Sequence, residues 1–286
     1  MNVPKDLGQS EQLEPGIAPM RHGLYLAPFE ELAEPAVLAE LGVAAEQHGW
    51  DGLFMWDHVY RPPEETTLIG DTWISAAALA VRTERLQIGA TVTPVTRRRP
   101  QLLARESVAV DRLSQGRLIV GLGLGVDIGG ELSRFGEVVD PVVRGERLDE
   151  GAELLLALWS GEEVNFTGKH FQAEGVRFLP TSVRQPHPPL WFAARGVSGA
   201  RPVRRAARLG DGLHLIEIDA EGLSRVAALV AELRGSLDGF DFAVTTDAGT
   251  GGAQWSGTAA TWLLQSFAPT ATAAQVEAVI TAGPPR

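Results

Sequence analysis

Two apolar runs on either side of one helical segment decide the fold of this chain. The runs are Leu86-Gln87-Ile88-Gly89-Ala90-Thr91-Val92-Thr93 and Leu118-Ile119-Val120-Gly121-Leu122. Between them, Pro100 suits a first helical turn, where its missing N–H is no loss, and Gly116 suits a helix end. Strands joined through one helix are best placed parallel, with the helix outside the sheet. The stretch therefore predicts a βαβ unit with its helix over residues 100–114.

A glycine ladder follows the second run, with Gly121, Gly123 and Gly125 at alternate positions. Because strand side chains alternate, the three glycines share one face for as long as the chain stays extended. A strand end without side chains on one face would let a flat ligand approach the backbone. A tight barrel corner or a flexible loop would explain the same glycines, so both interpretations stay open.

The rest of the chain repeats the alternation of strand and helix. The predicted strands cover residues 21–26, 52–56, 86–93, 118–122, 189–194, 212–216, 240–245 and 261–267. The predicted helices cover residues 33–48, 71–82, 100–114, 144–159, 198–209, 221–237 and 273–281, with a hairpin over 163–172. This order predicts an α/β fold, a closed (β/α)8 TIM barrel. Residues 246–258 are too short and glycine-rich for a normal crossover helix, so we expect a degenerate or irregular seventh βα unit.

Composition narrows the class of protein. We expect residues 1–19 to form a disordered extension and residues 20–286 to form a single barrel domain. The net charge of −11 argues against nucleic acid or an anionic membrane as the main partner. The sequence has no cysteine, which excludes disulfides, and its six histidines form no metal-binding pattern. No apolar run reaches membrane-spanning length, and a cytoplasmic location is the expectation.

An acid and an imidazole, Asp57 and His58, come directly after the apolar run 52–56. Polar groups placed at the end of a buried strand are costly unless something pairs with them or uses them. In an α/β barrel, the carboxyl ends of the strands form the active-site face. The pair is therefore a candidate site, although a loop cap at Asp57 and a hydrogen-bonded rim residue at His58 would explain it as well.

Several motifs together resemble the bacterial luciferase-like, flavin-dependent oxidoreductases. The most specific is Asp111-Arg112-Leu113-Ser114-Gln115-Gly116-Arg117, followed by the glycine ladder. The others include Trp56-Asp57-His58, Pro189-Leu190-Trp191-Phe192-Ala193-Ala194 and Arg205-Ala206-Ala207-Arg208-Leu209-Gly210-Asp211-Gly212. The similarity covers nearly all of the chain from residue 20 onward.

This resemblance implies a luciferase-like TIM barrel that binds FMN or the deazaflavin coenzyme F420 at its C-terminal face. The residues that match cofactor-contacting positions are Asp57, His58, Thr91, Val92, Gly123, Leu124, Gly125, Arg195 and Gly196. Thr91-Val92 matches a bulge that is often a non-prolyl cis peptide, and Arg195-Gly196 matches a loop that contacts the cofactor phosphate. Two positions depart from the family. Arg195 replaces a common glycine, and Val126 stands where the members that oxidise sugar phosphates have glutamate.

The implied function is that of an oxidoreductase acting on a small organic substrate. We expect His58 to donate or accept a proton because imidazole titrates near neutral pH, and Asp57 to orient His58 or to bond the cofactor ring. The Asp-His pair favours F420 with reductase chemistry, while FMN with monooxygenase chemistry stays open. Arg97, Arg98 and Arg99 have two interpretations: attraction of an acidic substrate or of the polyglutamate tail of F420, or a solvated basic loop.

A non-catalytic flavin-binding barrel is the alternative function, and the short seventh unit favours it. A cofactor-free barrel would quench the fluorescence of neither flavin nor deazaflavin. The resemblance also implies a homodimer, since dimers are usual in that family.

Overall fold

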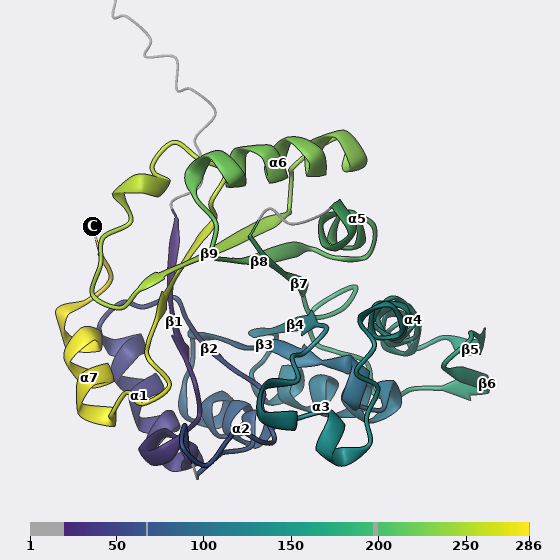
Figure 1. The fold of residues 1–286 in the computed structure, drawn as a ribbon, viewed down its shortest axis with the longest axis horizontal. Coiled ribbons are helices and arrows are strands. Elements are labelled where there is room, and N and C mark those ends of the chain that lie inside the picture. Colours follow the sequence, from purple (N-terminus) through teal and green to yellow (C-terminus); the bar gives the residue numbers. More distant parts are fainter. Residues whose placement is uncertain (1–19, 67, 197–199, 286) are drawn as a thin grey trace, which may run out of the picture.

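The computed structural model describes residues 20–66, 68–196 and 200–285, which form a closed parallel barrel wrapped by helices (Figure 1). The barrel strands are β1 (Arg21–Leu26), β2 (Gly52–Met55), β3 (Gln87–Pro94), β4 (Leu118–Gly123), β7 (Leu190–Arg195), β8 (Gly212–Ile216), β9 (Asp241–Asp247) and β10 (Trp262–Ser266). The helices are α1 (Pro35–Gln47), α2 (Thr72–Arg82), α3 (Pro100–Leu113), α4 (Pro141–Trp159), α5 (Ala200–Leu209), α6 (Ala220–Arg234) and α7 (Ala273–Ala282). The predicted (β/α)8 barrel is confirmed.

Each barrel strand pairs in parallel with its neighbours, in the order β1-β10-β9-β8-β7-β4-β3-β2, and β2 closes the ring on β1. All eight predicted strands are present. The predicted hairpin is β5 (Glu163–Thr167) with β6 (Gln172–Arg177), which projects outward beside α4 (Figure 1). The first residues of the helix predicted over 198–209 and the expected extension over 1–19 lie outside the described residues.

The seventh unit is degenerate, as predicted. Between β9 and β10 the chain forms only the 3-10 helix η5 (Ala253–Trp255). The barrel closes here nevertheless, because β9 and β10 stay paired from Ala243 with Trp262 to Asp247 with Ser266. The side chain of Gln265 secures the connection: it accepts from the Gly249 N–H at 2.6 Å and donates to the Thr250 carbonyl at 2.8 Å. The two hydrogen bonds satisfy backbone groups of a connection that has no α-helix of its own.

Two apolar clusters hold the barrel together. The inner cluster fills the barrel with large side chains and consists of Tyr25, Phe54, Ile119, Trp191, Ala243, Trp262 and Leu264. The larger cluster packs the outward faces of the strands against the surrounding helices. Because the middle of each strand is buried on both faces, most of the strands contain a continuous apolar run in the sequence.

The most specific motif of the sequence, residues 111–117, is structural. Asp111 accepts hydrogen bonds from the backbone N–H groups of Val183, at 2.6 Å, and Arg184, at 3.2 Å. The buried guanidinium of Arg117 donates to the backbone carbonyls of Ala80, Thr83, Leu86 and Ser114. The motif therefore joins the α2–β3 connection, the start of β4 and the segment before β7, at the end of the barrel away from Asp57 and His58.

Neither a membrane span nor a metal centre is found in the described ranges. Among residues 20–66, 68–196 and 200–285, no helix is long and apolar enough to cross a bilayer. Within the same ranges, no three His, Asp or Glu side chains are grouped closely enough to hold a metal ion.

Candidate active site

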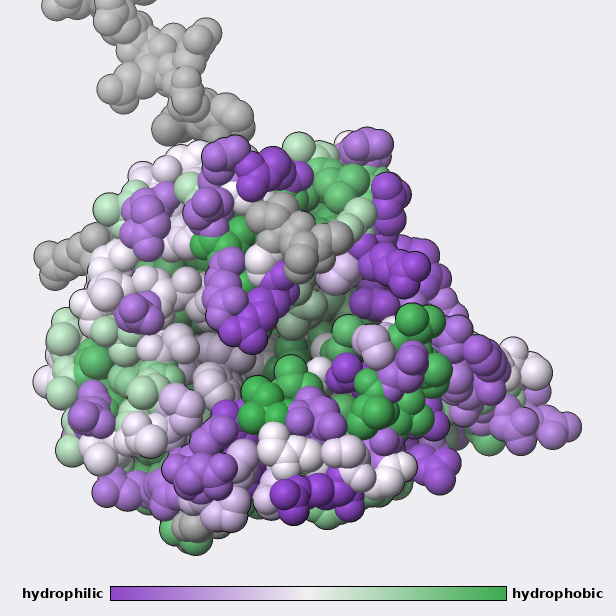
Figure 2. All heavy atoms as spheres, viewed as in Figure 1, coloured by the Kyte–Doolittle hydropathy of each residue, from purple (hydrophilic) through white to green (hydrophobic). Residues whose placement is uncertain are grey.

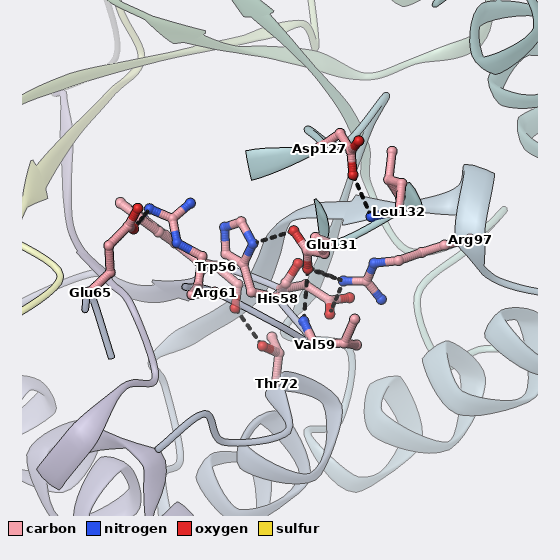
Figure 3. A network of polar contacts seen from close by, with 12 residues as sticks. Trp56, His58, Val59, Arg61, Glu65, Thr72, Arg97, Asp127, Glu131 and Leu132 are labelled. Carbon is pink, nitrogen blue, oxygen red and sulfur yellow. Dashed lines mark hydrogen bonds and ion pairs between the residues drawn. The ribbon is translucent and has the colours of Figure 1, made fainter. Parts of the chain in front are cut away.

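The candidate site lies where β2, β3 and β4 end, on the C-terminal face of the barrel. Asp57 and His58 follow β2, Arg97 and Arg98 follow β3, and Glu131 lies in the loop after β4. Figure 3 shows the side chains of His58, Arg97 and Glu131 pointing toward one another, and Figure 2 shows that the molecule is hollowed near the middle of the face it presents. The carboxyl ends of neighbouring parallel strands meet at one edge, which brings these residues together.

Asp57 is buried in an ion-pair cluster with two arginines. Arg97 Nη2 donates to Asp57 Oδ1 at 2.9 Å and to the Asp57 carbonyl at 2.7 Å, and Arg98 Nη2 lies 3.1 Å from Oδ2. The side chains of Asp57 and Arg97 are only 2% and 6% exposed. Burial by itself would raise the pKa of Asp57, but the two guanidinium groups outweigh burial and hold that pKa below its usual range.

His58 pairs with a different carboxylate. Its Nδ1 lies 2.7 Å from Oε2 of Glu131, whose side chain is 2% exposed. The other oxygen, Oε1, accepts from the Val59 N–H at 2.8 Å and lies 3.8 Å from Arg97 Nη2. A carboxylate only accepts, so Nδ1 carries the proton in this contact and Nε2 of neutral His58 is the basic nitrogen.

The expectation that Asp57 orients His58 is therefore wrong. Asp57 is engaged by Arg97 and Arg98, and the hydrogen bond to the imidazole comes from Glu131. For the same reason, neither interpretation of the basic loop holds for Arg97 and Arg98. They are neither solvated nor available to attract an acidic ligand, because they neutralise a buried carboxylate.

The predicted bulge in β3 is confirmed. The Thr91–Val92 peptide is cis, and the register between β3 and β4 shifts between Ala90 and Thr93. Thr91 is fully buried and Val92 is partly exposed at the end of the barrel.

The glycine ladder has a structural reason that differs from the predicted one. A Cβ added at Gly121 would lie 2.7 Å from Thr91 Cγ2, and one at Gly123 would lie 2.8 Å from Val92 Cγ2. Gly125 has a φ of 69°, and a Cβ there would lie 2.9 Å from Pro94 Cβ. Because these positions have no side chains, strand β3 can pack closely against them. The glycine face of the ladder is therefore covered by protein.

Hydrogen bonds also fix the end of the ladder. The Leu124 carbonyl accepts from the Thr96 hydroxyl at 3.0 Å, and the Gly125 carbonyl accepts from Arg144 Nη1 at 2.9 Å. Arg144 extends from α4, which begins at Pro141. The backbone at residues 124–125 is thus fixed by side chains from two other elements.

Arg195 and Gly196 lie on a different part of the same face, at the end of β7. Arg195 Nε donates to Glu217 Oε2 at 2.6 Å, and both side chains are largely exposed. The Gly196 N–H donates to the Ile216 carbonyl at 2.8 Å, and Gly196 has a φ of 58°. The residues that follow, 197–199, lie outside the described ranges, so the helix start expected to face a phosphate is not described.

Sequence reasoning missed Glu131 and the aromatic surroundings of His58. The rings of Phe29 and Trp56 lie 5.8 and 5.9 Å from the imidazole, measured between centroids. The Trp56 indole N–H is buried and has no hydrogen-bond partner among the described residues. Trp56 belongs to the quoted Trp-Asp-His motif, but Glu131 carries no signal that sets it apart from other loop carboxylates.

Comparisons with known proteins agree with this architecture. The F420-dependent glucose-6-phosphate dehydrogenase of Gordonia bronchialis is 34% identical over 186 residues, which are 64% of this chain and 53% of that protein. The chain thus spans about half the length of the curated relatives it matches.

Two solved structures share the fold. The monooxygenase RslO1 from Streptomyces bottropensis is 25% identical, with a TM-score of 0.67 over 80% of this chain and 71% of that one. An F420-dependent secondary alcohol dehydrogenase in complex with an F420-acetone adduct is 21% identical, with a TM-score of 0.69 over 79% of this chain and 68% of that one. The profile of the luciferase-like monooxygenase family matches residues 17–249. Since that match spans most of the chain and the barrel is the one the family resemblance implied, the protein belongs to the luciferase-like monooxygenase family.

Proposed function

We propose that the protein is an oxidoreductase that binds coenzyme F420 at the C-terminal face of the barrel and uses His58 to move a proton to or from a small organic substrate. The observation that carries the proposal is the contact between His58 Nδ1 and Glu131, which fixes the tautomer of an imidazole at this face. The name of the curated relatives supports F420 over FMN.

The residues present fit a flat, partly polar ring. Trp56 offers a buried indole N–H that lacks a partner in the described ranges, and buried donors of this kind are nearly always satisfied. The residues proposed to hold the cofactor are Asp57, His58, Thr91, Val92, Gly123, Leu124, Gly125, Arg195 and Gly196. When bound, F420 supplies hydride transfer, whereas FMN also supports reaction with dioxygen.

His58 acts as the acid or base in this proposal. Glu131 holds Nδ1–H, so Nε2 can accept a proton or return one. The apolar rings of Phe29 and Trp56 exclude water on one side of the imidazole. Asp57 contributes indirectly, because its pairs with Arg97 and Arg98 fix the strand end from which His58 projects.

Fluorescence titration of the purified protein with F420 and with FMN tests the proposal. We expect F420 to bind with the higher affinity, and His58→Ala to lose turnover while it still binds F420 through the other proposed contacts. Preferential binding of FMN would instead indicate a monooxygenase. Failure of both cofactors to bind would refute the proposal.

The non-catalytic alternative keeps one supporting observation, the absence of an α-helix between β9 and β10 in the described chain. It predicts that the wild-type protein binds a cofactor but shows no turnover, so that His58→Ala has no activity to lose. The homodimer also remains a proposal, which light scattering of the full chain would test.

A further inference from the structure

A pocket with a volume of about 360 Å³ lies at the N-terminal end of the barrel. Its charged and amide side chains come from the end of α1, the starts of β1, β2 and β3, and the segment before β7: Arg21, Glu46, Asp51, Arg85, Gln87 and Arg184. The volume is that of a site for a small molecule. The proposed cofactor site lies at the opposite, C-terminal end, so the function proposed above does not account for this pocket.

Two arginines of the pocket have unused hydrogen-bond donors. Most arginines in the described part of the chain donate a side-chain hydrogen bond or form an ion pair. The exposed side chains of Arg85 and Arg184 do neither with any residue of the ranges 20–66, 68–196 and 200–285. Their backbone N–H groups are bonded, that of Arg85 to Glu46 and that of Arg184 to Asp111 at 3.2 Å. Both side chains therefore project from a fixed backbone with their guanidinium groups available to a ligand.

Two other charged side chains of the pocket are already compensated. The guanidinium of Arg21 pairs with the carboxylate of Asp241. Glu46 accepts hydrogen bonds from the backbone N–H groups of residues 84–86, and the buried guanidinium of Arg117 also attracts its charge. Neither Arg21 nor Glu46 therefore needs a ligand for its charge to be balanced.

Arg85 and Arg184 leave an excess of positive charge in the pocket. Asp51 is the remaining carboxylate of the lining, and it accepts from the His22 N–H at 2.7 Å. Two guanidinium groups against one carboxylate give one net positive charge, in a chain whose net charge is −11. Arginines near the ends of α2 and α3 also offset the partial negative charge of those helix ends, but that role does not require both side chains to line one pocket.

We infer that the pocket binds a small phosphate-bearing anion, inorganic phosphate or a phosphate monoester, with Arg85 and Arg184 as its main donors. A guanidinium group matches two phosphate oxygens with a pair of parallel hydrogen bonds. Phosphate presents oxygens in several directions, so guanidinium groups from two different segments can share it, whereas the oxygens of a carboxylate lie in one plane. Gln87, whose side-chain amide has no hydrogen-bond partner in the described ranges, adds a neutral donor to the lining.

A bound anion would connect two segments that are far apart in the sequence. Arg85 lies in the connection between α2 and β3, and Arg184 lies in the segment before β7. An anion that binds only the folded chain stabilises it increasingly as the anion concentration rises. The site would therefore give phosphate a stabilising role that depends neither on F420 nor on turnover.

Isothermal titration calorimetry of the full chain with inorganic phosphate and with glycerol 3-phosphate tests the inference, at constant ionic strength and with F420 present or absent. We expect one anion bound per chain in both conditions. Arg85→Gln and Arg184→Gln should each weaken binding about tenfold or more, since each loses hydrogen bonds to a charged ligand. Thermal unfolding should show that phosphate raises the melting temperature of wild type more than that of either variant.

Two further variants make the result specific. Asp51→Asn removes the opposing charge but keeps an oxygen for the His22 N–H, so it should tighten binding about threefold or more. Arg177→Gln removes a 56% exposed arginine on the β5–β6 hairpin and should leave the phosphate affinity unchanged. All of these variants should bind F420 as the wild type does, because none of them alters the C-terminal face.

The outcomes distinguish this inference from the proposed function. If phosphate binding does not saturate at millimolar concentrations, or if wild type and both arginine variants bind phosphate equally, the pocket is not a phosphate site. If F420 displaces the phosphate, the anion occupies the cofactor site and the inference is wrong. If F420 fails to bind while the arginine and Asp51 variants change the phosphate affinity as expected, the pocket is supported and the proposed function fails.

Discussion

His58 Nδ1 lies 2.7 Å from Glu131 Oε2, although 73 positions separate the two residues in the chain. The contact joins the loop after β2 to the loop after β4 at the C-terminal face. It determines which imidazole nitrogen holds the proton, and the acid–base role proposed for His58 depends on it.

Glu131→Gln should lower kcat by about tenfold, because a charge-assisted hydrogen bond to Nδ1 is replaced by a neutral one, at a cost of about 1.5 kcal/mol. Steady-state kinetics with F420 should show this loss in kcat while the F420 dissociation constant stays unchanged. Glu131→Asp keeps the charge and should recover part of the rate. Equal losses in both variants, with unfolding at lower urea, would indicate a structural role only.

His58→Ala should reduce turnover by about 100-fold to 10,000-fold, the usual contribution of a general acid or base. The variant should still bind F420 in the fluorescence titration, because the other proposed cofactor contacts remain. His48→Ala is the matched control, since His48 ends α1 and bonds the Ala44 carbonyl far from the site. Normal turnover in His58→Ala would exclude the proton-transfer role.

Asp57→Asn should lower the free energy of unfolding by about 3–5 kcal/mol, because Arg97 and Arg98 lose their buried counter-ion. Urea unfolding measures the change. Glu221→Gln, which disrupts an exposed pair with Arg225 in α6, should cost less than about 0.5 kcal/mol.

The stabilisation from Asp57 should also depend on pH. The folded-state pKa of Asp57 is lowered, so the contribution is complete above its unfolded-state pKa and is lost as the pH falls through the lower folded-state value. Wild type and Asp57→Asn should therefore converge in stability at strongly acidic pH. A constant difference at every pH would contradict this account.

His214 should make the protein less stable in mild acid. This histidine lies edge-on to Tyr25, 4.8 Å between ring centroids, and burial inside the barrel lowers its pKa to about 3. Below the ordinary value of 6.5, the unfolded chain binds a proton that the folded chain does not, so the free energy of unfolding falls as the pH falls. The slope from this residue should be about 1.4 kcal/mol per pH unit between about pH 6 and pH 4.

Urea unfolding across that pH range should show the slope reduced in His214→Phe, which fills the site with an apolar ring. The exposed His48→Gln variant should keep the wild-type slope. If His214→Phe and wild type lose stability in parallel, His214 takes up its proton in the folded protein.

Gly123→Ala should destabilise the barrel by about 1–3 kcal/mol, the usual cost of forcing extra volume into a packed site. The added Cβ would lie 2.8 Å from Val92 Cγ2 and press on the bulge of β3. Gly145→Ala in α4 is the control. Its nearest neighbour would be Arg205 Nη2 at 3.8 Å, so the helix should gain up to about 1 kcal/mol. Thermal unfolding measures both, and a neutral Gly123→Ala would show that the ladder is not required by β3.

The sequence by itself determined the barrel. Continuous apolar runs, amphipathic segments between them, and markers such as Pro100 and Gly116 act within a few residues, so they can be interpreted without knowing the fold. The same local signals predicted that no normal crossover helix follows β9. The bulge at Thr91 and Val92 was predicted from the family resemblance, because hydrophobic periodicity gives no sign of it.

Only the tertiary structure decided which charges meet. Asp57 is adjacent to His58 in sequence, yet it pairs with Arg97 and Arg98, and His58 pairs with Glu131. The reason is geometric: Asp57 and His58 sit at the end of one strand, and their partners are supplied by the neighbouring strand ends that the closed barrel brings alongside. Such partners are 40 to 73 positions away, and no local pattern in the chain distinguishes them from other arginines and glutamates.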